Sequence, residues 1–262
     1  MIKTKKYKCG IVGYPLTKPR SIQIWKKFFR KYNINASMLK FEIKNSKFDN
    51  FIKDIKFSNN FLAMAVTMPY KKKILNYLNK TDSFAKKTGA VNLVVKKKEK
   101  LIGYNTDIFG AVETIKRELK VYNLIIIIGL GGTGTALFNY LSKTYKKKKF
   151  ILVSKKDKKN FNLKNTTVLK KISKKFLMQK ALIINCTPLG SSLTKSFINK
   201  SPLDEKKFEN LNKKSFIFDI VYSPKKTMLN LLSKKNNVSY INGVYMNTLQ
   251  AEKALKIVFN KK

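Results

Sequence analysis

Short apolar runs alternate along the chain with stretches whose apolar residues recur at helical spacing. In the first hundred residues this pattern predicts strands at 7–13, 36–43 and 61–68. Between these strands it predicts helices over 24–32 and 48–57. Strands that alternate with helices are typical of a parallel α/β sheet.

The alternation begins again near Asp107. A helical stretch over 108–119 precedes the β-branched run at 124–128, and an apolar pattern at helical spacing follows it. A last helix near 248–259 is expected to fold back on the first unit. The further strands predicted in this second half are 150–156, 181–188 and 215–222.

The charge of the chain is strongly positive. Its 262 residues contain 57 Lys plus Arg against 14 Asp plus Glu, a net charge of +43, and only Arg20, Arg30 and Arg117 are arginines. Such a charge favours nonspecific attraction to polyanions. The lysines are spread along the whole length, however, whereas nucleic-acid-binding proteins concentrate cations on one face. We therefore expect a drifted composition and no specific nucleic-acid partner.

The chain contains no His and two distant cysteines, Cys9 and Cys186. The lack of His removes Ser-His and Cys-His nucleophilic arrangements and the commonest metal ligand. Without CxxC spacing, neither a disulfide framework nor a metal site is expected. The apolar run at 124–128 is too short to span a bilayer, and the N-terminus lacks a secretory pattern. A cytoplasmic protein with no membrane partner is predicted.

A glycine cluster lies directly after the run at 124–128 and directly before a helical pattern, which is the context that a dinucleotide-binding G-x-G-x-x-G requires. The first Gly allows the turn, the second lets the backbone approach a pyrophosphate, and the third permits close packing of helix on strand. Free N–H groups at the helix start bind the anion. The candidate cofactor-binding residues are Gly129, Gly131, Gly132, Thr133 and Gly134.

The end of the next strand bears on the choice of dinucleotide. About 20 residues after the glycines, an acidic side chain would bind the ribose 2′-OH of NAD. The chain has Ser154, Lys155 and Lys156 there, and no carboxylate before Asp157. Two cations suit a 2′-phosphate, so NADP is favoured over NAD; the alternative is that both lysines are simply solvated.

Several segments, in order, resemble the shikimate dehydrogenase family. They are GIVGYPLTKPRS, VTMPYK, KKTGAVNLVV, LIGYNTDIFG, IIGLGGTG, INCTPLG, DIVYSPKKTMLNLL and NGVYMNTLQAEKAL. The resemblance covers essentially the whole chain. It implies an α/β fold of two domains: a substrate-binding and catalytic domain at 1–106, completed by the C-terminal helix in 243–262, and a Rossmann NADP-binding domain at 107–242. The implied reaction is reversible reduction of 3-dehydroshikimate to shikimate by NADPH, in aromatic amino-acid biosynthesis.

The resemblance implies that Lys71 of VTMPYK is the catalytic lysine and that Asp107 of GYNTD is its partner. Independently, hydride delivery to a ketone builds an alkoxide, which a neighbouring ammonium can stabilise or protonate. A paired Asp would fix the geometry of the lysine. Without the motif, Lys71 would be read as a solvated charge, and Asp107 has an alternative as a helix N-cap before Ile108.

The resemblance implies further site residues. Amide and hydroxyl groups can bind a cyclic polyol without adding charge. The implied substrate-binding residues are Ser21, Thr67, Asn92, Tyr222 and Gln250. Gly243 is implied to lie by the nicotinamide, and Asn185, Thr187 and Pro188 to form a loop on the cofactor side. No metal is implied. The family includes monomers and dimers, so the oligomeric state is left undecided and a homodimer is one of the two alternatives.

The chain departs from the family at the site for the substrate carboxylate. Where the family has two serines in S-x-S, the chain has Pro19-Arg20-Ser21, and Ala65 replaces the Asn of the usual NVT. Loss of one hydroxyl contact to a charged group costs about 1.5–3 kcal/mol. Weaker substrate binding with retained catalysis is predicted. The alternatives are a quinate/shikimate dehydrogenase with relaxed cofactor choice, or a noncatalytic relative that binds anions or nucleic acid.

Overall fold

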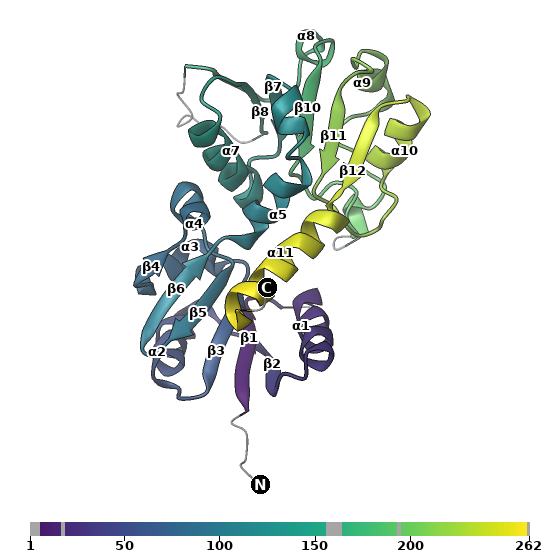
Figure 1. Ribbon diagram of the computed structural model, residues 1–262. Coiled ribbons are helices and arrows are strands. Elements are labelled where there is room, and N and C mark those ends of the chain that lie inside the picture. Colours follow the sequence, from purple (N-terminus) through teal and green to yellow (C-terminus); the bar gives the residue numbers. More distant parts are fainter. Residues whose placement is uncertain (1–5, 17–18, 156–163, 193–194, 261–262) are drawn as a thin grey trace. The chain divides into compact units, whose positions relative to one another are not determined.

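The computed structural model describes residues 6–16, 19–155, 164–192 and 195–260. The chain folds into two compact units (Figure 1). The first comprises Met1–Phe109 with Gln250–Lys262, and the second comprises Gly110–Leu249. The chain therefore passes between the units within one helix, α5, and returns within another, α11.

The first unit contains a six-stranded sheet and flanking helices. Its elements are β1 (Tyr7–Gly13), α1 (Arg20–Lys31), β2 (Ala36–Glu42), the 3-10 helix η1 (Asn45–Lys47), α2 (Phe48–Phe57), β3 (Phe61–Val66), α3 (Tyr70–Lys73), the 3-10 helix η2 (Ile74–Tyr77), β4 (Lys80–Thr81), α4 (Ser83–Thr88), β5 (Leu93–Lys97), β6 (Lys100–Tyr104) and α5 (Thr106–Thr114). The strand order is β2-β1-β3-β5-β6-β4.

This first sheet is mixed, which corrects the expectation of a parallel sheet. Strand β1 runs parallel to β2 and β3, but β5 is antiparallel to both β3 and β6. Strands β5 and β6 form a hairpin whose two-residue turn is Lys98-Glu99, with Lys98 at a positive φ of 54°. Such turns usually carry Gly, Asn or Asp. The hairpin therefore could not be predicted from its turn residues.

The period-2 alternation of the strands places the two faces of the first sheet in separate cores. Cys9 and Ile11 pack on one face with Trp25 of α1 and with Leu255 of α11. On the other face, residues such as Val12 pack against helices α2 and α3. The C-terminal helix thus packs in the core of the first unit, as predicted.

The second unit contains a sheet whose neighbouring strands are all parallel. Its elements are α6 (Glu118–Val121), β7 (Leu124–Ile128), α7 (Gly132–Thr144), β8 (Lys149–Val153), β9 (Thr166–Leu169), α8 (Lys174–Leu177), β10 (Ala181–Asn185), the 3-10 helix η3 (Lys195–Phe197), α9 (Glu205–Glu209), β11 (Phe216–Asp219), α10 (Met228–Lys235) and β12 (Ser239–Asn242), followed by the start of α11 (Gly243–Phe259), whose remainder belongs to the first unit. The strand order β12-β11-β10-β7-β8-β9 is that of a Rossmann fold. The predicted α/β class is confirmed.

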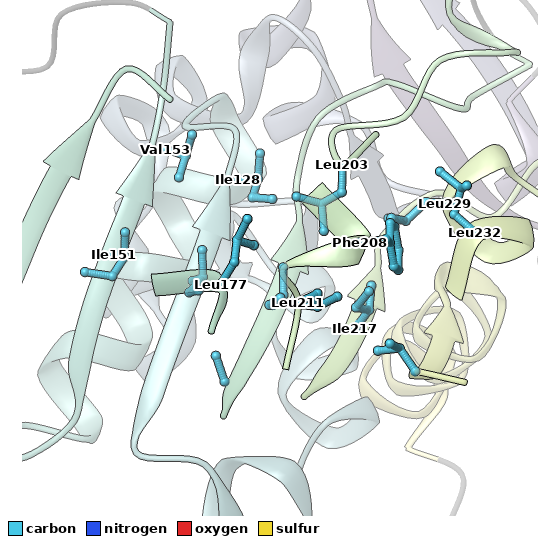
Figure 2. Close-up of a cluster of buried hydrophobic side chains, with 14 of the residues drawn as sticks. Ile128, Ile151, Val153, Leu177, Leu203, Phe208, Leu211, Ile217, Leu229 and Leu232 are labelled. Atoms are coloured by element: carbon cyan, nitrogen blue, oxygen red, sulfur yellow. The ribbon is translucent and has the colours of Figure 1, made fainter. Parts of the chain in front are cut away.

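Strand β7 explains the uninterrupted apolar run at 124–128. All five of its residues are buried, because side chains on both faces of this parallel sheet are covered. Figure 2 shows the core on one face, a single buried cluster that includes Ile128, Leu203, Phe208 and Leu229. The predicted domain boundary before Asp107 falls within α5, and the one before Gly243 falls at the start of α11. The role of each domain stays a prediction.

Candidate active site

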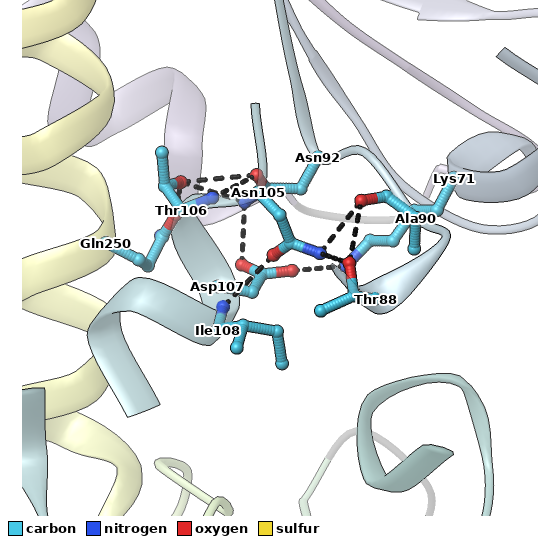
Figure 3. A network of polar contacts seen from close by, with 9 residues as sticks. All are labelled: Lys71, Thr88, Ala90, Asn92, Asn105, Thr106, Asp107, Ile108 and Gln250. Carbon is cyan, nitrogen blue, oxygen red and sulfur yellow. Dashed lines mark hydrogen bonds and ion pairs between the residues drawn. The ribbon is translucent and has the colours of Figure 1, made fainter. Parts of the chain in front are cut away.

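Lys71 and Asp107 form an ion pair inside the first unit (Figure 3). Lys71 lies on α3, just after β3, and Asp107 lies in the first turn of α5. The Lys71 Nζ donates to Asp107 Oδ2. Their side chains are 31% and 23% exposed, so a ligand can still reach both groups.

The backbone around Lys71 is fixed by neighbouring buried residues. Tyr70 is fully buried, stacks on Phe48 with ring centroids 3.9 Å apart, and donates its hydroxyl hydrogen to the Ile43 carbonyl. The Val91 N–H donates to the Lys71 carbonyl at 2.8 Å. These contacts hold the start of α3, which sets the direction of the Lys71 side chain.

Asn92 binds the other oxygen of Asp107. Its Nδ2 donates to Asp107 Oδ1 at 2.8 Å and to Thr106 Oγ1 at 2.9 Å, and its Oδ1 accepts from the Thr106 N–H at 2.7 Å. The Thr106 hydroxyl also donates to Gln250 Oε1 at 3.3 Å. The fold thus joins Lys71, Asp107, Asn92 and Gln250, four residues singled out in the sequence, in one polar network.

Asn105, the residue before Thr106, holds the backbone on which this network is built. Its Oδ1 accepts from the Ile108 N–H at 3.0 Å, and its Nδ2 donates to Thr88 Oγ1 at 3.1 Å and to the Ala90 carbonyl at 2.9 Å. Its N–H donates to Asp82 Oδ1 at 3.3 Å, and burial raises the pKa of Asp82. Asn105 therefore ties the start of α5 to the segment that follows α4.

The alternative role of Asp107 as an N-cap before Ile108 is wrong. Asn105 makes the capping bond, three residues before Ile108, while both oxygens of Asp107 point to Lys71 and Asn92. Sequence analysis missed the roles of Asn105 and Thr106. An Asn three residues ahead of the first apolar helical position was the available signal.

The remaining substrate-binding residues predicted are placed as follows. Thr67 follows β3, and its N–H donates to the Val12 carbonyl at 2.9 Å. Ser21 lies in α1, and its Oγ is buried with no hydrogen-bond partner among the described residues. Thr67 and Ser21 are in the first unit, whereas Tyr222 is in the second.

The glycine cluster has the geometry that a dinucleotide requires. Gly129 has φ +94°, and Gly134 packs so closely that an added Cβ would lie 1.9 Å from the Gly129 oxygen. Added Cβ atoms on Gly131 and Gly132 would meet nothing within 4 Å. Helix α7 begins at Gly132 without a side-chain cap, so its first N–H groups, including that of Thr133, can bind an anion. The residues present fit a pyrophosphate.

The end of β8 places two further candidates beside this loop. The Ser154 N–H donates to the Leu169 carbonyl at 2.9 Å, and Lys155 is exposed. Lys156 lies outside the described residues. The β7 and β8 strands are adjacent and parallel, so Ser154 and Lys155 follow the strand next to the glycine loop.

Thr187, two residues after the end of β10, packs directly against the glycine loop. A Cβ on Gly129 would lie 2.6 Å from Thr187 Cγ2 and 2.9 Å from Thr187 N. Gly243, which begins α11, packs against the Ile220 carbonyl, which an added Cβ would approach to 2.1 Å. Cys186, next to Thr187 in the chain, packs against Gly134, and burial raises the pKa of its thiol to about 12. That thiol is therefore protonated at neutral pH.

Metal-ligand clusters and membrane-length apolar helices are both missing from the part of the chain that the structure describes. There, no group of three or more His, Cys, Asp or Glu could hold a metal ion. Likewise, none of the helices described has the length and apolar character needed to cross a membrane.

Comparisons with known proteins agree along the whole length. Residues 11–94 match the family described as Shikimate dehydrogenase substrate binding domain. The NADP(+) shikimate dehydrogenase of Clostridium botulinum is 33% identical over 254 residues, covering 95% of each chain. The crystal structure of shikimate dehydrogenase from Aquifex aeolicus superposes with a TM-score of 0.82 at 25% identity, covering 100% of this chain and 95% of that one. The crystal structure of a shikimate dehydrogenase in complex with NADP+ superposes with a TM-score of 0.83 at 25% identity, covering 100% of this chain and 93% of that one.

Proposed function

The chain belongs to the shikimate dehydrogenase family, and on this premise we propose which residues carry out the reaction. The protein is an NADP-dependent oxidoreductase of aromatic amino-acid biosynthesis, and its reaction is the reversible reduction of 3-dehydroshikimate to shikimate. The observation that carries the assignment of residues is the Lys71–Asp107 pair: one lysine of a lysine-rich chain is held by a carboxylate within an ordered polar network.

Lys71 is the proton donor. When the substrate ketone becomes an alcohol, its carbon gains a hydride and its oxygen gains a proton. The ammonium of Lys71 stabilises the negative charge that develops on that oxygen and transfers the proton to it. In the reverse direction the neutral amine accepts the proton from the substrate hydroxyl.

Asp107 and Asn92 hold Lys71 in position. Asp107 uses one oxygen for Lys71 and the other for Asn92, so the carboxylate cannot rotate without losing a hydrogen bond. A charge-assisted pair of this kind fixes the donor for transfer.

The substrate hydroxyls are bound by Thr67, Asn92 and Gln250, and the substrate carboxylate by Ser21. Asn92 and Gln250 support this because both already belong to the network around Asp107. Ser21 supports it because a buried hydroxyl without a partner among the described residues is costly unless a ligand satisfies it. Tyr222 is proposed as a further substrate-binding residue on the resemblance alone.

The cofactor is NADP, which supplies the hydride when bound in its reduced form. The N–H groups of Gly132, Thr133 and Gly134 bind its pyrophosphate at the start of α7. Lys155, together with Ser154, follows β8, where a 2′-phosphate is expected. Lys156 is proposed for the same role on the sequence alone.

The assignment is tested by NADPH oxidation with 3-dehydroshikimate, followed by absorbance. Lys71→Ala is expected to lower kcat by about 10²–10⁴-fold, because the proton donor is lost. Lys72→Ala is the matched control: it removes the same charge from the next, exposed position and should leave kcat within about twofold.

Two results would contradict the proposal. If Lys71→Ala and Lys72→Ala behaved alike, local charge and not proton transfer would be responsible. If folded wild type bound NADPH without turnover, the substrate assignment would fail. The same assay gives KM for 3-dehydroshikimate, which is expected to be about tenfold to a hundredfold higher than in relatives with both serines.

We further propose a cytoplasmic location and no specific nucleic-acid partner, because the lysines are dispersed and both cysteines are free and buried. Gel shifts should show DNA binding that lacks sequence preference and disappears with salt. A homodimer stays a prediction, which light scattering of the pure protein decides.

A further inference from the structure

Asp219 is a fully buried carboxylate that the reaction does not use. It ends β11 and has no exposed surface. Its Oδ1 accepts from Asn185 Nδ2 at 2.9 Å and from the Val221 N–H at 3.1 Å. Its Oδ2 accepts from the Thr227 hydroxyl at 3.1 Å and the Tyr240 hydroxyl at 3.0 Å. Burial of this acid is unfavourable, and four donors from three segments offset the cost.

The bond to Asn185 fixes which way that amide faces. Asn185 ends β10, directly beside Asp219 in the sheet register, and is also fully buried. Because its Nδ2 faces Asp219, its Oδ1 faces the opposite way, where it accepts from the Thr187 N–H at 2.9 Å and the Thr187 hydroxyl at 2.7 Å. The orientation of one amide therefore links the carboxylate to the loop after β10.

That loop lies against the glycine cluster. Thr187 packs on Gly129, the first glycine of the cluster, and its Oγ1 accepts from the Leu189 N–H at 3.3 Å. The ends of β7, β10 and β11 are adjacent in the sheet. In a Rossmann sheet, β7 and β10 flank the point where the strand order reverses and the dinucleotide binds.

We propose that Asp219 is a positioning residue for the cofactor loop, acting through Asn185 on Thr187. This inference rests on the proposed NADP site at the glycine cluster. Asp219 itself touches no cofactor. Its function is to hold the Asn185 amide in the one orientation that presents an acceptor to both donors of Thr187.

The first test combines NADPH titration calorimetry with amide hydrogen exchange. Asp219→Ala frees the Asn185 amide to rotate, so the Kd for NADPH is expected to rise about tenfold. In the protein without ligand, a peptide containing Thr187 and Leu189 should exchange faster. Asn185→Ala should reproduce both effects, and the double variant should add nothing further, because the two residues act along one path.

Two variants separate positioning from a merely structural role. Tyr240→Phe removes a donor on the Oδ2 side and leaves the bonds from Asp219 to Asn185 and from Asn185 to Thr187 intact. It should lower the melting temperature and leave the Kd for NADPH and the exchange at Thr187 within about twofold. Asp219→Asn keeps one oxygen that accepts from Asn185, and the Thr227 and Tyr240 hydroxyls can rotate to accept from its new amide N–H groups. This variant should therefore bind NADPH almost as tightly as wild type.

The proposal is overturned if Asp219→Ala binds NADPH within twofold of wild type, or if Tyr240→Phe weakens binding as much as Asp219→Ala. Should Asp219→Ala not fold, Asn185→Ala carries the same test, since Asp219 then keeps three of its four donors. If wild type did not bind NADPH, the proposed cofactor site would be refuted. The hydrogen-exchange measurement on Asp219→Ala is made without cofactor, so it tests the hydrogen bonds from Asp219 through Asn185 to Thr187 independently of that site.

Discussion

At the scale of single residues, Lys71 differs from its neighbours by its contacts and not by its side chain. Lys73, two positions along, pairs with Asp49 at 2.7 Å and lies over the Phe48 ring, so it stabilises the fold. Lys72 between them is exposed. Lys71 differs from both in its partner: the Asp107 carboxylate, which also binds Asn92 and lies 36 positions away in the sequence.

The glycines of the cluster allow a residue-scale prediction. Gly131→Ala adds a Cβ into open space, so the melting temperature should stay close to that of wild type. The same Cβ would stand where the backbone must approach the pyrophosphate, so the Kd for NADPH should rise at least about tenfold.

Gly134→Ala is the contrasting variant. Its Cβ would lie 1.9 Å from the Gly129 oxygen, so helix α7 must move away from β7 and the melting temperature should fall. If Gly131→Ala bound NADPH normally, or lowered the melting temperature as Gly134→Ala does, the glycine loop would not be the pyrophosphate site.

At the scale of elements, the start of α5 connects the fold to the site. Its first turn carries Thr106 and Asp107, and Asn105 caps it while bonding Thr88 and Ala90. A capping residue usually stabilises only its own helix. Here the cap also fixes the first turn of α5 and therefore the position of the Asp107 carboxylate that binds Lys71.

Asn105→Ala is therefore expected to affect stability and catalysis together. The lost cap and the unsatisfied groups of Thr88 and Ala90 should lower the free energy of unfolding by about 2–3 kcal/mol. The kcat should also fall, because the carboxylate that holds Lys71 shifts. Urea unfolding and NADPH oxidation measure the two effects.

Asn105→Asp is the matched control for this element. It keeps an acceptor for the Ile108 N–H but cannot donate to the Ala90 carbonyl, so its stability should lie between those of wild type and Asn105→Ala. A normal kcat in a destabilised Asn105→Ala enzyme would mean that Asp107 does not depend on the cap.

At the scale of the whole molecule, charge dominates. Fourteen acidic residues cannot neutralise 57 cationic ones, so like charges repel across the folded surface. Several of the acids are further committed to local roles, such as Asp107 with Lys71 and Asp219 in its buried network. Self-repulsion of this kind destabilises a compact state.

Salt should therefore stabilise the protein. Raising sodium chloride from about 20 to about 300 mM shortens the Debye length and weakens the repulsion. The free energy of unfolding should increase by about 1 kcal/mol, which raises the melting temperature by roughly 2–4 °C. Calorimetry at several salt concentrations measures this, and a flat or falling melting temperature would show that repulsion does not limit stability.

The sequence by itself determined those features that depend on neighbours along the chain. The apolar period predicted strands such as β1, β3 and β7 and helices such as α2 and α11, and the glycine cluster between a strand and a helix indicated the dinucleotide fold. In both cases the physical cause is local: side-chain period sets which face is buried, and glycine permits φ +94° at Gly129. The hairpin at Lys98-Glu99 escaped prediction because its turn lacks the residues that usually mark one.

Beyond the pairing of Lys71 with Asp107, which the resemblance implied, only the tertiary structure decided which polar residues meet. Lys71, Asn92, Asp107 and Gln250 come from distant segments, and their hydrogen bonds depend on how strands and helices pack. The capping role of Asn105 and the donors around Asp219 were likewise settled by packing. A buried polar group must find a partner wherever the fold supplies one, and that requirement acts through space, where sequence spacing carries no information.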